Sequence, residues 1–156
     1  MLDRTVHADV DYWRNLEWPA APNELDYEIY EQYANGRVLL LGSTRLLLNL
    51  CTEAWDLEPK YFDFKIRNKD WFSIDEPWDT IMIDGGLAFG KDFAERLLAI
   101  ALPKCNIFIA RAFLNPSWPT KYAVYFPRAD ELNPQPEEIT VNEVYSFYIW
   151  KNLKQY

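Results

Sequence analysis

Short apolar runs recur along the chain and predict the strands of a sheet. The runs Arg37–Leu41, Thr80–Ile83 and Ile107–Ala110 lack polar alternation, which is typical of strands buried on both faces. Aromatic and β-branched residues predict further strands at three positions. These are Tyr61–Ile66, Lys121–Phe126 and Val144–Trp150.

Apolar residues at helical spacing predict helices between these strands. The first runs from about 25 to 33 and ends at Asn35-Gly36, a pair that favours a helix C-terminus. A second is expected over 44–55, where leucines recur at i, i+4 spacing. A third is expected over 91–102, and Pro103 stops it.

The order of these elements predicts one α/β domain. A strand, a helix, two strands, a helix and a strand are followed by two further strands, which is typical of an open sheet. Short connections favour parallel, right-handed crossovers, and the last two strands are expected to form an antiparallel edge. We expect a single domain over residues 1–156, with an N-terminal arm and helix over 1–36 and a core over 37–156.

Composition narrows the partners that such a domain can have. Its 17% aromatic residues argue against disorder. The net charge is −8, and the sequence lacks the basic stripe that a nucleic-acid binder needs. No apolar stretch reaches the length of a membrane span, and none precedes a secretion cleavage site. We therefore expect a cytoplasmic protein that binds neither nucleic acid nor membrane.

The two cysteines are not expected to take part in the function. Cys51 and Cys105 each lie in an apolar stretch, which favours buried reduced thiols over a disulfide. They lack Cys-x-x-Cys spacing, and only one histidine is present to join them. We expect no metal site.

Ligands of open α/β sheets bind at the carboxyl ends of strands, and polar motifs follow three of the predicted strands. Gly42-Ser43-Thr44 follows the first, where a glycine allows close backbone approach and a helix N-terminus suits an anionic group. Asp63 lies in the next strand, where a carboxylate can accept two neighbouring hydroxyls, as in a ribose. Asp84-Gly85-Gly86 follows a third strand and places a fixed negative charge beside open space. Each motif also has a plain interpretation, as a turn or as a solvated edge acid.

Asp70-Trp71 lies between Asp63 and Asp84 and forms a fourth candidate. An acid beside an aromatic residue can bind an amine and stack a ring. The alternative is a core tryptophan beside a surface aspartate.

Taken in order, the segments GRVLLLGSTRLLLNLC, YFDF, KDW and PWDTIMIDGGL resemble class I S-adenosylmethionine (SAM) dependent methyltransferases. The resemblance covers roughly residues 9–113 and includes Asp11-Tyr12-Trp13 and Trp18-Pro19 in the N-terminal arm. Within that family it is similar to members with an LG-x-T turn, a G-D-W motif and an I-D or G-D-G motif. Lys69 stands where the G-D-W motif has its glycine. The resemblance implies a truncated Rossmann-like domain, mostly parallel, with helices on both faces of the sheet.

The same resemblance implies roles for the candidate residues. The Gly42-Ser43-Thr44 turn would hold the methionine part of SAM, Asp63 the ribose, and Asp70 with Trp71 the adenine. Asp84, followed by Gly85, would lie near the amino group or the methyl acceptor and is the candidate catalytic residue. His7, in an arm that can close over the site, or a tyrosine are the other candidate bases.

Two departures from the family suggest a reduced scaffold. Only Phe64–Lys69 separate Asp63 from Asp70, so the second helix and the third strand are expected to be missing or fused. Asn115–Thr120 are too few for the helix that normally joins the fifth and sixth strands.

Three functions remain after this reading. The first is a SAM-dependent methyltransferase acting on a small molecule. The second is a non-catalytic SAM-binding or degenerate module that acts as a partner or regulatory subunit. For either function, an exposed aromatic edge would permit a homodimer. A nicotinamide-dependent oxidoreductase is the third, and the missing GxGxxG motif counts against it. Aromatic residues that could form a protein-facing patch, with core packing as the alternative, are Trp118, Tyr122, Tyr125 and Tyr148.

Overall fold

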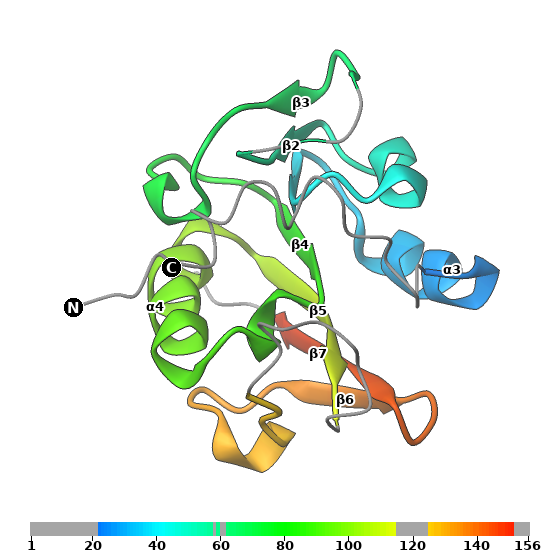
Figure 1. Ribbon diagram of the computed structural model, residues 1–156, viewed down its shortest axis with the longest axis vertical. Coiled ribbons are helices and arrows are strands. Elements are labelled where there is room, and N and C mark those ends of the chain that lie inside the picture. Colours follow the sequence, from blue (N-terminus) through cyan, green and yellow to red (C-terminus); the bar gives the residue numbers. More distant parts are fainter. Residues whose placement is uncertain (1–21, 58, 60–61, 115–124, 152–156) are drawn as a thin grey trace.

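A computed structural model describes residues 22–57, 59, 62–114 and 125–151 and contains one seven-stranded sheet (Figure 1). The strands are β1 (Val38–Leu41), β2 (Glu53–Trp55), β3 (Ile66–Arg67), β4 (Thr80–Asp84), β5 (Ile107–Phe113), β6 (Glu137–Thr140) and β7 (Tyr145–Lys151). Their order is β3-β2-β1-β4-β5-β7-β6. The first five strands pair in parallel, and β7 is antiparallel to both β5 and β6. The predicted fold class, mostly parallel with an antiparallel C-terminal edge, is confirmed.

Helices cover both faces of the sheet, as predicted. The α3 helix (Glu24–Tyr33) and the short 3-10 helix η1 (Arg45–Asn49) pack on one face, while α4 (Lys91–Ala101) packs on the other (Figure 1). A capping box starts α3, because the Asn23 side chain accepts from the Asp26 amide and Asp26 accepts from the Asn23 amide. The shorter 3-10 helices η2 (Trp71–Ser73), η3 (Gly86–Ala88), η4 (Leu102–Lys104) and η5 (Ala129–Glu131) complete the described elements.

The apolar run of β1 is continuous because both of its faces are buried. Val38 and Leu40 join the core beneath α3, whereas Leu39 and Leu41 join the core beneath α4. All four side chains are nearly inaccessible to solvent. Burial on two faces explains why this strand lacks the polar alternation of a half-exposed strand.

The helix predicted over 44–55 is wrong in its second half. The chain forms only η1 and then turns back to pair with β1, starting at Thr52. The Thr52 amide donates to the Val38 carbonyl at 2.8 Å, and the Val38 amide donates to the Thr52 hydroxyl at 3.0 Å. This pairing makes Glu53–Trp55 the second strand, so that strand ends one residue before Asp56.

One other strand prediction was misplaced, and another lies mostly outside the described residues. Among the described residues of the segment predicted at 61–66, only Ile66 is in a strand, which spans Ile66–Arg67 and is the third strand rather than the second. The third strand is therefore present, while the described residues between β2 and β3 contain no helix. Within the segment predicted at 121–126, residues 125 and 126 belong to no strand, and 121–124 lie outside the described residues. Strand β6 at 137–140 was not predicted.

The cysteine prediction is confirmed, since Cys51 and Cys105 are buried and unbridged. In the part of the chain that the structure describes, no helix has the length and apolar character to cross a membrane.

Candidate functional site

The carboxyl ends of β1, β2 and β4 lie at the same level of the sheet. Leu41 is in register with Trp55 on one side and with Ile83 on the other. Beyond β1 the Gly42 amide donates to the Trp55 carbonyl at 2.8 Å, so the glycine turn continues the contact with β2. The motifs that follow these three strands therefore meet at one edge, the position where open α/β sheets bind ligands.

Asp56 is the acid at the end of β2, and it faces the glycine turn. The Ser43 hydroxyl donates to Asp56 Oδ2 at 2.5 Å. Burial raises the pKa of the Asp56 carboxyl, while the Ser43 hydrogen bond acts in the opposite direction. Sequence reasoning missed Asp56 because the helix predicted over 44–55 covered Glu53–Trp55, the strand that ends just before it. The available signal was the short segment Glu53-Ala54-Trp55 followed by an acid.

Asp63 occupies a different position from the one predicted. It precedes β3, at the amino end of that strand, and its carboxylate accepts from the Lys65 amide at 2.9 Å. The Asp63 carbonyl also accepts from the Ile66 amide at 3.0 Å, so this residue forms the turn that enters β3. The prediction assigned Asp63 to the second strand, but that strand is Glu53–Trp55 and its acid is Asp56.

Asp70 and Trp71 do follow the carboxyl end of β3, as the motif predicted. Asp70 caps η2, since its carboxylate accepts from the Phe72 amide at 2.9 Å. Trp71 Nε1 donates to the Trp55 carbonyl at 2.7 Å, which brings the indole to the end of β2. The structure therefore places Trp71, Gly42 and Ser43 with Asp56 at one edge.

Two glycines at this edge have backbone conformations that other residues rarely adopt. Gly42 has φ of +115° and Gly85 has φ of +82°. A positive φ favours glycine because a Cβ would crowd the backbone. The turn after β1 and the turn after β4 both depend on this freedom.

Asp84, the predicted catalytic residue, is engaged in a buried ion pair. Arg111 Nε donates to Asp84 Oδ1 at 2.6 Å and Arg111 Nη2 donates to Oδ2 at 3.0 Å, while both side chains are 1% exposed. Tyr30 donates to Asp84 Oδ1 at 3.2 Å. Burial raises the pKa of Asp84, and the Arg111 charge and hydrogen bonds oppose this. The carboxylate is directed to Arg111 rather than to the open side of the turn, which argues against a role as general base.

A second acid completes this buried network. Arg111 Nη1 donates to Asp26 Oδ2 at 3.0 Å, and the Tyr145 hydroxyl donates to Asp26 Oδ1 at 2.9 Å. Burial lowers the pKa of Arg111, but Asp84 and the other acidic neighbours outweigh it and raise that pKa above its usual value. The network joins α3, β4, β5 and β7. Sequence reasoning missed it, although Arg111 was a visible charge inside an apolar run.

The remaining predicted residues divide into two groups. His7, Trp118, Tyr122 and the N-terminal arm motifs lie outside the described residues. Tyr148 is fully buried and donates to the Pro127 carbonyl at 2.8 Å, so it belongs to the core rather than to a protein-facing patch, and Tyr125 is partly buried. Among the described side chains, no three His, Cys, Asp or Glu residues gather in a way that could hold a metal.

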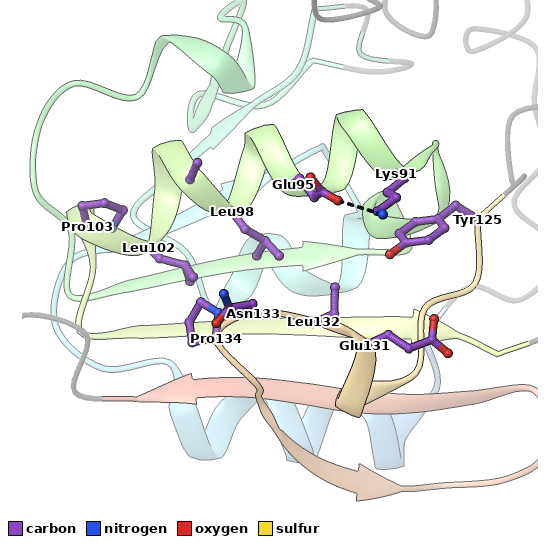
Figure 2. A pocket seen from close by; sticks show the side chains of 11 residues that line it. Lys91, Glu95, Leu98, Leu102, Pro103, Tyr125, Glu131, Leu132, Asn133 and Pro134 are labelled. Carbon is purple, nitrogen blue, oxygen red and sulfur yellow. Dashed lines mark ion pairs between the residues drawn. The ribbon is translucent and has the colours of Figure 1, made fainter.

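A hollow of about 640 Å³ lies elsewhere, between α4 and the segment 125–134 (Figure 2). Its lining includes Lys91 and Glu95, which form an exposed ion pair at 3.6 Å. None of the predicted site residues lines it. The convergence of strand ends, rather than this hollow, therefore defines the candidate site.

The strand order, the antiparallel β7 and the glycine turn after β1 define the class I methyltransferase-like fold. No protein-family model and no curated protein sequence matches the chain. At these low identities, the structural likeness below supports the fold alone.

Solved structures of SAM-dependent methyltransferases share this fold. The DhpI complex with S-adenosylhomocysteine (SAH) is 16% identical, with a TM-score of 0.64 over 93% of this chain and 92% of that chain. ChlM, the magnesium protoporphyrin IX methyltransferase from Synechocystis PCC 6803, with bound SAM, is 12% identical, with a TM-score of 0.56 over 96% and 97%. WbdD, a bifunctional kinase-methyltransferase, is 16% identical, with a TM-score of 0.65, and this chain spans only 42% of it.

Proposed function

We propose that this protein is a SAM-dependent methyltransferase that acts on a small molecule. One observation carries the proposal: at the carboxyl ends of β1 and β2 the Gly42 amide donates to the Trp55 carbonyl and the Ser43 hydroxyl donates to the Asp56 carboxylate. A glycine turn beside an acid at the next strand end matches an adenosyl ligand, which presents a pair of neighbouring hydroxyls. SAM and SAH are bound in ChlM and DhpI, which have the same fold.

The residues at this edge fit such a cofactor. Asp56 remains partly exposed, and its two oxygens suit the two hydroxyls of a ribose. Gly42, which has a positive φ, gives the turn after β1 no side chain of its own. We assign the methionine part to Gly42-Ser43-Thr44, the ribose to Asp56 in place of Asp63, and the adenine to Asp70 and Trp71. Gly85 forms the turn on the β4 side.

SAM supplies an activated methyl group on a sulfonium, so the protein's main contribution is alignment. The strand ends provide a rigid frame for this, because Gly42 and Trp55 continue the sheet hydrogen bonding. Asp84 fixes the β4 end through Arg111 and takes a positioning role. Because Asp84 is bound by Arg111 and does not act as a base, this site suits a small acceptor that has a low pKa or ionises by itself.

The binding of Asp84 by Arg111 also favours a second function. With its predicted base engaged, the chain would serve as a SAM-binding module that regulates or completes a partner. The two functions differ in turnover. A methyltransferase releases SAH from SAM in the presence of its acceptor, whereas a module binds SAM without consuming it.

Isothermal titration calorimetry with SAH tests the site. Asp56→Asn should weaken binding by roughly ten- to a hundredfold, because hydrogen bonds to a charged acceptor are worth about 1.5–3 kcal/mol. Asp63→Asn is the matched control and should bind as the wild type does, since Asp63 lies at the amino end of β3. Wild-type protein that does not bind SAH, or a control that loses binding while Asp56→Asn keeps it, would overturn the proposal.

A panel of small acceptors tests activity separately. Purified protein is incubated with SAM and each acceptor, and SAH is measured by chromatography. SAH release with one acceptor class, lost in Asp56→Asn, supports the enzyme. Binding of SAH with no release in any reaction supports the module.

A further inference from the structure

The hollow between α4 and the segment 125–134 has the size of a small-molecule site (Figure 2). Its volume of about 640 Å³ falls within the roughly 300–1,000 Å³ of pockets that hold organic ligands. Neither Gly42 nor Asp56 lines it, and the other residues of the candidate cofactor site are also missing from its lining. A ligand in this hollow would therefore occupy a second site.

Part of the lining is a continuation of the hydrophobic core. Leu98 and Leu102 of α4 and Leu132 after η5 belong to the buried core beneath α4, and each also borders the hollow. Pro103 and Pro134 border it toward the C-terminal end of α4 (Figure 2). A ligand that covers these side chains removes apolar surface from water, which favours a molecule with an apolar body.

The end of the hollow near the start of α4 carries its charged groups. Lys91, Glu95 and Glu131 lie toward this end (Figure 2). Lys91 is paired with Glu95 at 3.6 Å, and both side chains are exposed. Among the described residues, the Glu131 carboxylate has no ion-pair partner. Two carboxylates against one ammonium make this end negative, and Asn133, the remaining polar residue of the lining besides Tyr125, is uncharged.

Both carboxylates act on Tyr125, which lines the same end. The Tyr125 amide donates to the Ala88 carbonyl at 3.1 Å, which attaches this residue to η3. Burial together with the charges of Glu131 and Glu95 raises the pKa of the Tyr125 hydroxyl above its usual value, so the hydroxyl keeps its proton. Its oxygen has no hydrogen-bond partner among the described residues and is available to accept one. A positive group beside it would be attracted by both carboxylates.

We propose that this hollow binds a small organic ammonium ion, with its apolar body along Leu98, Leu102 and Leu132 and its charged group beside Glu95 and Glu131. The site goes beyond the proposed methyltransferase function and does not depend on it. The apolar lining supplies most of the affinity, because exposed charge pairs are worth little. The carboxylates decide the sign of the charge that the ligand carries.

Three probes with the same apolar body separate these contributions: 4-phenylbutylammonium, 4-phenylbutanoate and 4-phenylbutanol. Each is titrated into the isotope-labelled protein, and amide shifts are followed by NMR spectroscopy. The ammonium probe should shift amides of α4 and of 125–134 and should leave the amides of Gly42 and Asp56 in place. It should also bind more tightly than the alcohol, and the carboxylate probe should bind most weakly.

Two charge variants test the role of the carboxylates. Glu131→Gln should weaken binding of the ammonium probe by roughly two- to fivefold, the value of an exposed ion pair, and should leave the alcohol unaffected. Asp130→Asn is the matched control, because it removes the same charge from the adjacent exposed residue, which does not line the hollow. Lys91→Gln should strengthen ammonium binding by a similar factor, because it frees Glu95.

A third variant tests the place of binding. Ala99 is exposed and lines the hollow, so Ala99→Trp fills the space from the surface of α4 without changing a charge. It should abolish binding of the ammonium and of the alcohol. Circular dichroism checks that the variant is folded.

A preference for the ammonium probe that Glu131→Gln reduces and Asp130→Asn keeps supports the proposal. Four results would overturn it: no binding of any probe at millimolar concentration, equal or tighter binding of the carboxylate or the alcohol, equal effects of Glu131→Gln and Asp130→Asn, or full binding by folded Ala99→Trp. SAH binding is measured separately, so none of these results decides the proposed function.

Discussion

Arg111 donates two hydrogen bonds to the Asp84 carboxylate across the adjacent strands β4 and β5. The two residues are register partners, so the pair lies at the same level of the sheet as the candidate site. Arg111 then continues to Asp26 in α3 at 3.0 Å. Asp84, the predicted catalytic residue, is therefore part of a network that attaches α3 to the sheet.

Removing the arginine should destabilise the fold strongly. Arg111→Leu leaves the carboxylates of Asp84 and Asp26 buried without their cation, which costs about 3–5 kcal/mol in comparable cases. Urea unfolding followed by circular dichroism measures the loss. Lys91→Ala is the control, because its pair with Glu95 is exposed and worth about 0.5 kcal/mol or less. A loss below about 1 kcal/mol in Arg111→Leu would show that the network contributes little.

The glycine turn offers a paired test of strain and access. Gly42→Val and Gly90→Val each place a branched residue at a φ near +115°, with φ of +115° and +117° respectively. Each should lose about 1–3 kcal/mol of unfolding free energy. Only Gly42→Val should also weaken SAH binding, by roughly tenfold or more, because its side chain blocks a contact with the ligand. Equal effects on binding would mean that backbone strain, rather than access at Gly42, controls affinity.

Cofactor affinity should fall as the solution is acidified, and the fall should begin at a higher pH than an ordinary aspartate would give. Burial raises the pKa of Asp56, opposed by the Ser43 hydrogen bond, and only the ionised form accepts two hydroxyls. The pKa of Asp56 is higher in the folded than in the unfolded protein, so its ionisation lowers the free energy of unfolding as pH rises. Protonation of Asp56 in acid therefore does not promote unfolding. It should still weaken binding, because the ionised carboxylate is the form that accepts from the two hydroxyls.

Calorimetry with SAH from about pH 8 to about pH 4 follows this loss. Ser43→Ala should move it to higher pH, since the opposing hydrogen bond is gone. Asp56→Asn should show no such step, and a step that persists there would assign the titration to another group.

The thiols should be unreactive in the native protein. Burial raises the pKa of Cys51 to about 11, and Cys105 is also buried. Thiolate is the reactive form, so a disulfide reagent at neutral pH should label neither cysteine until the protein unfolds. In denaturant both of the 2 cysteines should react at once. Rapid labelling of a native thiol would contradict the packing around it.

Strongly patterned segments could be predicted from the sequence, because their pattern reflects burial that other elements share. The apolar runs at β1, β4 and β5 and the amphipathic α4 have one consistent period each. The segment 44–55 failed because leucines at helical spacing also suit a 3-10 turn followed by a strand. Tertiary pairing of Thr52 with Val38 decided between them, and no local pattern reports such a contact. Strand β6 was missed because its exposed glutamates give it no apolar signal.

The site followed the same division. Short motifs directly after strands predicted that Gly42, Ser43 and Trp71 lie at this edge of the sheet, and their cofactor-binding roles stay a prediction. Asp63 was chosen instead of Asp56 because one misplaced strand shifted the acid that follows it. The role of Asp84 could not be read from its position, because its partner Arg111 lies 27 residues further along the chain.

The strand order has a consequence for how the protein acquires its site. β1 lies between β2 and β4, so Val38 is paired with Thr80 across a long stretch of chain, and β4 needs β5 on its far side. Non-local pairing of this kind slows folding. A nascent chain that has emerged only as far as β3 would hold Gly42 and Asp56 without the central strand that supports them. The proposed ligand binding therefore requires the finished topology, and a fragment that ends at β3 should not bind SAH.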